Sequence, residues 1–196
     1  MMDVNRETAR KLFHLAAGAV LAFLISFGVV NVWHLVAITL VGFAASAARR
    51  KRRVPIVEWF LSRMERDDAM TTFPGKGAFF FFFGMLISVA IFPRDVAAAS
   101  VMVLAMGDSI SPLIALRLRK SWGMKRPLEA SAAGFVASFA GAALFLPVHE
   151  ALLASFAGMA IEAVDTVRGR RIEDNITMPL AAGAAVLLLR AIAAFF

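Results

Sequence analysis

One carboxylate in this chain has a chemistry that needs explaining. Asp108 lies in Met106-Gly107-Asp108-Ser109-Ile110-Ser111-Pro112, within a run that is otherwise apolar from Val96 to Leu116. A carboxylate near the middle of a membrane helix costs about 2.5–3.5 kcal/mol, so it is kept where it meets water, a cation or a partner. Pro112 has no N–H to donate to the carbonyl four residues back, which belongs to Asp108. The carboxylate and the bare carbonyl predict a cation site; the alternative is a kinked helix whose Asp108 is tied to a neighbouring Arg or Ser.

Cationic groups near the N-terminus form a second candidate cluster. Glu7, Arg10, Lys11 and His14 are spaced three and four apart, so they share one face of the first predicted helix. A basic collar at the membrane surface would explain Arg and Lys residues alone. His14 lies one turn deeper, where a headgroup contact is harder to justify, and this favours a functional face.

A glycine-flanked lysine precedes the third predicted span. In Phe73-Pro74-Gly75-Lys76-Gly77, the free N–H groups of a helix start, two glycines and a lysine together suit a phosphate group. The spacing is not that of a P-loop, and no strand precedes it. The alternative is a loop lysine at the membrane surface.

Further polar residues are predicted at the same end of the molecule. Glu129 and Ser131 open one helix behind Lys125 and Arg126, and we expect Glu129 to face inward; its alternative role is to complement the helix dipole. Glu162 and Asp165 close the next helix. Asp174, Asn175 and Thr177 open the last helix, either as an ordinary helix start or with the carboxylate of Asp174 and the amide of Asn175 as ligands for Mg²⁺ carried by phosphates.

The composition indicates an all-α, polytopic membrane protein. Hydrophobic residues make up 60% of the 196 residues, and the mean hydropathy is +0.76. Seven stretches approach or reach the length of a transmembrane helix. They are Leu12–Val30, Val32–Ala48, Gly77–Phe92, Val96–Leu116, Leu128–Leu146, Ala151–Val167 and Ile176–Phe196. We therefore expect a single integral-membrane domain over residues 1–196, with an interfacial amphipathic helix at about residues 54–66.

The distribution of Lys and Arg predicts the orientation. All of the 21 Lys and Arg residues except Arg94 and Arg190 fall at the N-terminus or in alternate loops. The positive-inside rule puts the N-terminus and the candidate site in the cytoplasm and the C-terminus outside. Topology and anionic lipid headgroups account for the net charge of +7, so no nucleic-acid partner is expected. The chain has no cysteine, and its three histidines are too scattered for a zinc signature.

These groups combine into a site for phosphoryl transfer. Carboxylates that hold a divalent metal and cations that clamp phosphate oxygens supply most of the catalysis in that reaction. A nucleotide would come from the cytoplasm, and a lipid alcohol would enter sideways from the bilayer.

The chain also resembles a known family. Arg10-Lys11-x-x-His14, Gly107-Asp108, Arg126-x-x-Glu129-x-Ser131 and Asp174-Asn175-x-Thr177-x-Pro179-Leu180 occur in the order seen in the CTP-dependent lipid kinases, which include dolichol, polyprenol and phytol kinases and the fungal-type diacylglycerol kinase. The resemblance implies a multi-helix membrane enzyme that uses CTP and Mg²⁺, or another divalent cation, with Arg10, Lys11, Asp108, Glu129, Asp174 and Asn175 in its active site. The chain departs from the family at Pro127, Ala130 and Ala115.

The resulting hypothesis is a polyprenol or dolichol-type kinase. Asp108, Glu129, Asp174 and Glu162 are the candidate metal ligands, and Asp108, Lys11, Arg10 and His14 the candidate catalytic residues. The nucleotide and its phosphates would be bound by Lys76, Gly75, Gly77, Lys125, Arg126, Ser131, Asn175 and Thr177. Two alternatives remain, a CTP-using CDP-lipid synthase and a non-enzymatic lipid-phosphate carrier. The sequence leaves open the lipid, the identity of the general base, and whether the protein forms a homodimer.

Overall fold

The computed structural model describes residues 4–49, 73–122, 127–168 and 173–195, and within these ranges the chain is helical with short connections and no strand. The prediction of an all-helical chain is confirmed. The described helices are α1 (Val4–Ser26), α2 (Val32–Arg49), α5 (Lys76–Ile91), α6 (Arg94–Trp122), α7 (Pro127–Ala142), α8 (Val148–Arg168) and α9 (Asp174–Ala193).

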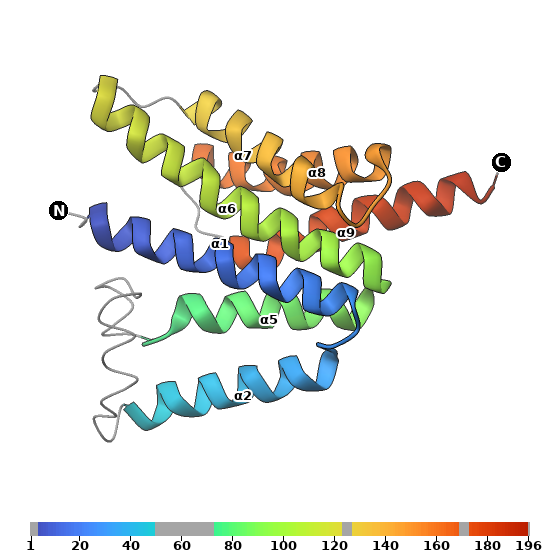
Figure 1. Cartoon of the computed structure of the whole chain (residues 1–196), viewed down its shortest axis with the longest axis horizontal. Helices are drawn as coiled ribbons and strands as arrows, with labels where there is room; N and C mark the ends of the chain where they lie inside the picture. The colour runs from blue at the N-terminus through green and yellow to red at the C-terminus, as the bar shows by residue number, and fades with distance from the viewer. Residues whose placement is uncertain (1–3, 50–72, 123–126, 169–172, 196) are drawn as a thin grey trace.

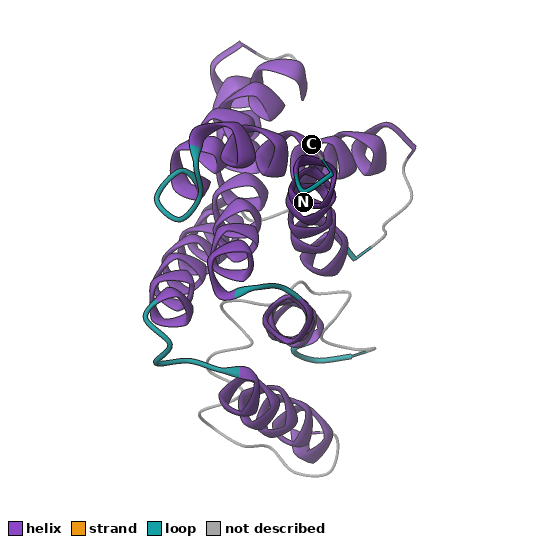
Figure 2. Ribbon diagram, turned by 90° about the vertical axis from the view of Figure 1, so that its right-hand side faces the viewer, coloured by secondary structure: helices purple, strands orange, loops and turns teal. Residues whose placement is uncertain are grey.

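Successive helices run in opposite directions, so the start of α1 and the end of α9 lie at opposite ends of the bundle (Figure 1). Helix α6 contacts α1, α5, α7, α8 and α9. Helix α2 packs on α5 at the edge of the bundle, as both views show (Figures 1 and 2). The centre of the bundle is therefore α6.

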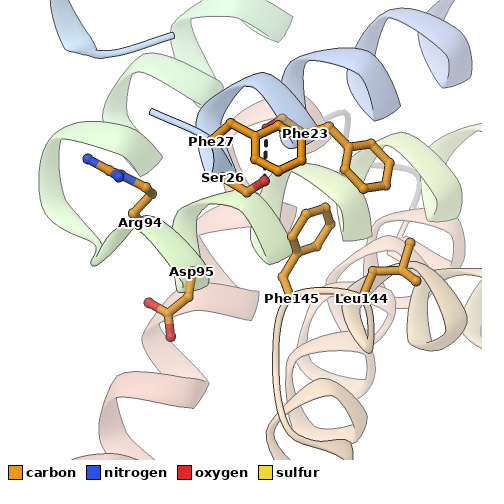
Figure 3. A pocket seen from close by; sticks show the side chains of 7 residues that line it. All are labelled: Phe23, Ser26, Phe27, Arg94, Asp95, Leu144 and Phe145. Carbon is orange, nitrogen blue, oxygen red and sulfur yellow. Dashed lines mark hydrogen bonds between the residues drawn. The ribbon is translucent and has the colours of Figure 1, made fainter. Parts of the chain in front are cut away.

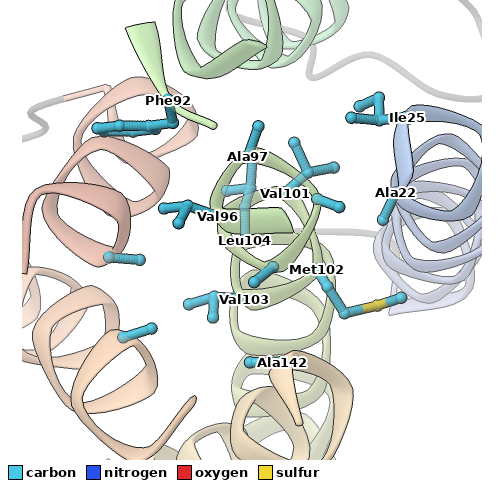
Figure 4. Close-up of a cluster of buried hydrophobic side chains, with 14 of the residues drawn as sticks. Ala22, Ile25, Phe92, Val96, Ala97, Val101, Met102, Val103, Leu104 and Ala142 are labelled. Carbon is cyan, nitrogen blue, oxygen red and sulfur yellow. The ribbon is translucent and has the colours of Figure 1, made fainter. Parts of the chain in front are cut away.

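The first half of α6 forms most of the hydrophobic core. Every residue from 96 to 105 is buried, and most of them are alanine or valine (Figure 4). Such small side chains let neighbouring helices approach closely on all sides. Ala22 and Ile25 from α1, Phe92 from the turn before α6, and Ala142 from α7 complete the cluster shown. Asp108 follows this fully enclosed segment directly.

Within the described ranges, three helices are long and apolar enough to cross a membrane, namely Arg6–Ser26, Arg94–Leu118 and Asp174–Ala193. Val32–Ala48, Lys76–Ile91 and Leu128–Ala142 are apolar but shorter. Large hydrophobic side chains lie on the surface, among them Phe27, Trp33 and Leu128, each at least 75% exposed. An apolar surface of this kind suits association with lipid. The amphipathic helix predicted near residues 54–66 lies outside the described residues.

Candidate active site

Gly107 allows four helices to meet beside Asp108. A Cβ atom at Gly107 would lie 2.6 Å from Met159 Sδ on α8, 2.8 Å from Ser138 Oγ on α7 and 3.1 Å from Met178 Cε on α9. Only a residue without a side chain leaves room for all three neighbours. The Gly-Asp pair thus puts a carboxylate next to a point where α6, α7, α8 and α9 converge.

The cation held by Asp108 in this structure is the side chain of Lys11. Lys11 Nζ donates to Asp108 Oδ1 at 2.7 Å and to the Asp108 carbonyl oxygen at 2.5 Å. The two side chains are only 8% and 11% exposed. Helix α6 continues through Pro112, which leaves that carbonyl without its intrahelical donor. The carboxylate and the bare carbonyl therefore bind one ammonium group from α1, and not a neighbouring Arg or Ser.

His14 lies on the other side of the same carboxylate. Its Nε2 is 3.4 Å from Asp108 Oδ2, and its ring centroid is 4.0 Å from that of Phe81. With Nε2 turned towards Asp108, Nδ1 is the ring atom left to accept a proton. The prediction that Lys11 and His14 share one face of α1 is confirmed.

Arg10 lies one residue before Lys11 on α1 and contacts Glu7. The guanidinium group of Arg10 is 2.5 Å from Glu7 Oε1. Its buried Nε has no hydrogen-bond partner among the residues that the structure describes. Arg10 therefore keeps donor capacity on the same helical face as Lys11 and His14.

Helix α9 begins deep inside the bundle. A Cβ atom at Gly84 would lie 2.0 Å from the carbonyl oxygen of Asn175, so the first turn of α9 packs against the backbone of α5. Gly84 is eight residues into α5, about 12 Å along its axis. Met178, one turn further along α9, reaches Gly107. The start of α9 therefore lies near the level of Asp108.

Two more acids lie within electrostatic reach of Asp108. Glu162, on α8, is influenced by the charges of Asp108, Lys11 and Asp174, and it is hydrogen-bonded by the Ser111 side chain. Asp174, at the start of α9, is influenced by Asp108 and Lys11. Carboxylates from α6, α8 and α9 and a lysine from α1 thus share one polar region inside the bundle.

The donor set in this region suits Mg²⁺ only in combination with phosphates. Among the described residues, no three His, Asp or Glu side chains lie close enough to hold a metal ion. Mg²⁺ sites in phosphate-transfer proteins commonly use one or two carboxylates, with phosphate oxygens and water completing the shell. Asn175 offers a buried Oδ1 with no hydrogen-bond partner in the described part of the chain. Two carboxylates and one amide oxygen fit that incomplete type of site.

The structure corrects the expectation for Glu129. Its side chain is exposed in the first turn of α7, whereas Asp108 is buried. The inward orientation predicted for Glu129 is therefore wrong. A carboxylate at this position complements the positive end of the helix dipole, which was the alternative explanation. Ser131, two residues later in α7, is half-buried.

The start of α5 has the backbone expected of a phosphate-binding turn. Gly75 caps the helix in a left-handed conformation (φ 81°), and no side chain of the described ranges caps the free N–H groups. Gly77 is half-buried in the first turn. Lys76 Nζ is 2.5 Å from Glu173 Oε1, and both side chains are partly exposed. Thr177 Oγ1 lies 3.5 Å from the Glu173 carbonyl oxygen. Lys125 and Arg126 lie outside the described residues, and so does the side chain of Asp165.

Two polar residues of this region were missing from the sequence prediction. Glu173 pairs with Lys76, and Ser111 binds Glu162. Ser111 could have been found, because it lies one turn after Asp108 on the same helix. The contact of Glu173 joins residues far apart in the chain, and no spacing pattern reports it.

A separate ion-pair network lies towards the other end of α6. Arg190 binds Glu150 with both Nε (2.9 Å) and a terminal nitrogen (2.7 Å), and it binds Asp95 at 2.6 Å. Asp95 is thirteen residues before Asp108 on α6, about 20 Å away along the axis. Arg190, Asp95 and Glu150 therefore form a network that is separate from the Asp108 region.

A cavity of about 500 Å³ opens beside this network, far from Asp108. It is lined by Phe23, Ser26, Phe27, Arg94, Asp95, Leu144 and Phe145 (Figure 3). The three phenylalanine rings gather on one side, with Arg94 and Asp95 on the other. None of the predicted site residues lines this cavity.

The chain is similar to a protein of Methanocaldococcus jannaschii described as uncharacterized protein MJ1137. The two sequences are 29% identical, and the match covers 89% of each chain. No protein-family model and no solved structure matches the chain. The similarity therefore extends over most of the chain.

Proposed function

We propose that this chain is a membrane kinase that transfers the gamma-phosphate of CTP to the hydroxyl of a polyprenol or dolichol-type isoprenoid alcohol. The observation that carries the proposal is the contact of Asp108 with Lys11 and His14 inside an apolar bundle. An ionisable cluster at this depth in a membrane protein is costly to build and commonly marks a functional site. CTP as the nucleotide comes from the resemblance to the CTP-dependent lipid kinases.

The membrane arrangement is part of the proposal. Seven helices would span the bilayer, with the Lys- and Arg-rich ends in the cytoplasm and the C-terminus outside. The antiparallel order of the helices is compatible with this topology (Figure 1). The nucleotide reaches the polar region from the cytoplasm, and the lipid alcohol reaches it from the bilayer. The basic residues also contact anionic lipid headgroups.

The phosphates of the nucleotide would bind to the cationic residues at that end of the bundle. Arg10 Nε is a buried donor with no partner among the described residues, and Lys76 is the first residue of α5. A bound divalent metal neutralises phosphate charge and makes the gamma-phosphorus easier to attack. When a nucleotide binds, Lys76 would leave Glu173 and bind a phosphate oxygen instead. This exchange is feasible because the side chains of Lys76 and Glu173 are both accessible.

His14 is the best-placed proton acceptor for the lipid hydroxyl. Asp108 contacts Nε2 and so orients the ring, and Nδ1 takes the proton as the lipid oxygen forms its bond to the gamma-phosphorus. The bond between that phosphorus and the bridging oxygen breaks at the same time, and CDP leaves. Positioning and charge neutralisation supply most of the rate in such a transfer.

Labelled nucleotide tests the proposal against its two alternatives. Purified protein is incubated with a mixed isoprenoid alcohol extract and CTP labelled at either the gamma or the alpha phosphate. Transfer of the gamma label to lipid is the expected result. Transfer of the alpha label would mean a CDP-lipid synthase, and the absence of nucleotide turnover would favour a lipid-phosphate carrier.

A further inference from the structure

Two oxygen atoms of Asp108, Oδ1 and the main-chain oxygen, are already bound by Lys11. His14 faces Oδ2. A metal ion at Asp108 would have to displace the buried lysine, because like charges repel strongly away from water. Asp108 therefore serves to hold side chains of α1 and not a metal ion.

The other two acids of the polar region, Glu162 and Asp174, lie on α8 and α9. The charge of Asp174 acts on Glu162, and the charge of Asp108 acts on both acids. Ser111 occupies one hydrogen-bonding position of Glu162. A carboxylate has about four lone-pair positions, so Glu162 can accept hydrogen bonds and bind a metal ion at the same time.

Asn175 provides an oxygen that no described residue uses. Its Oδ1 is buried without a hydrogen-bond partner among the described residues. Pro179, four residues later, has no N–H to offer the Asn175 main-chain oxygen, which packs against Gly84. The packing against Gly84 fixes the position of this residue next to Asp174. A buried amide oxygen beside a carboxylate is a typical hard ligand for Mg²⁺ or Mn²⁺.

We propose that the divalent cation is held by Asn175 Oδ1 with the carboxylates of Glu162 and Asp174, whereas Asp108 is a positioning residue that holds Lys11 and His14. The inference rests on the proposed function for the reaction that the cation serves. It divides the acids of the region into two groups with different tasks. Asp108 organises α1, and the acids of α8 and α9 hold the metal together with the nucleotide phosphates.

Binding of Mn²⁺ tests this division without any nucleotide. The loss of the free Mn²⁺ signal in electron paramagnetic resonance measures binding to purified protein in detergent. Asn175→Leu and Glu162→Gln should each weaken binding by at least the roughly 10–100-fold that loss of an outer-shell partner costs. The double variant Lys11→Met with Asp108→Asn should bind Mn²⁺ like the wild type.

Glu150→Gln is the matched control, because Glu150 is a buried carboxylate of the distant Arg190 network. It should leave Mn²⁺ binding unchanged. The inference is overturned if the Asp108 double variant loses Mn²⁺, if Asn175→Leu retains full binding, or if the wild type binds no Mn²⁺ at millimolar concentration. Mn²⁺ binding with the expected pattern, but without transfer of label from CTP, would refute the proposed function and leave this inference standing.

Discussion

The pair formed by Lys11 and Asp108 predicts a strong and non-additive effect on stability. The two side chains are almost fully buried, and Lys11 Nζ makes two short contacts with Asp108. Removing one partner of a buried ion pair leaves an uncompensated charge and costs about 3–5 kcal/mol. Lys11→Met and Asp108→Asn should each lower the free energy of unfolding by that amount.

The Lys11→Met, Asp108→Asn double variant distinguishes the energy of the ion pair from the effects of the two single substitutions. Replacing both charges by uncharged groups of similar volume is often close to neutral. The coupling energy in the double-mutant cycle should therefore be several kcal/mol. Unfolding in mixed micelles, induced by increasing the SDS fraction and followed by the helical circular dichroism signal, provides the free energies. Additive effects, or single variants within about 1 kcal/mol of the wild type, would refute a buried ion pair.

Other contacts make predictions of the same kind. Gly84→Ala should cost about 1–3 kcal/mol or more in the same unfolding assay, because its Cβ would lie 2.0 Å from the α9 backbone. Gly42→Ala should stabilise α2 by about 0.5–1 kcal/mol, because no atom of the described residues lies within 4 Å of a Cβ added there. Equal effects of the two changes would contradict the packing of α5 on α9. In the distant network, Glu150→Gln should cost about 1.5–3 kcal/mol, because two nitrogens of Arg190 bind this buried group. Asp95→Asn should cost only about 0–1 kcal/mol since Asp95 is 43% exposed, and the reverse order would contradict this description.

Local chemistry allowed the central feature of the site to be predicted. A carboxylate in an apolar run and a proline four residues later indicate a bare carbonyl oxygen and a need for positive charge. The spacing of Lys11 and His14 indicated that they share a face. The contact between Lys11 and Asp108 spans 97 residues of sequence, so it becomes visible only when α1 packs on α6.

Orientation around a helix and depth in the bundle could not be predicted. The sequence of α7 is apolar and small on every side, so the pattern does not tell which way Glu129 faces. The depth of α9 depends on the close approach of Gly84 to the Asn175 carbonyl oxygen. The sequence around Gly84 does not show which helix will pack against this glycine. The sequence suggested polar residues near one end of the bundle, and the three-dimensional packing brings part of this set to Asp108.

Transfer of gamma-labelled CTP phosphate to lipid by the Lys11→Met, Asp108→Asn double variant is the most direct test of the account. This variant should fold nearly as well as the wild type, because neither charge is left unpaired. It should nevertheless transfer no label, since His14 has lost the carboxylate that orients it. A stable double variant that phosphorylates lipid at the wild-type rate would contradict the claim that the buried pair serves the reaction.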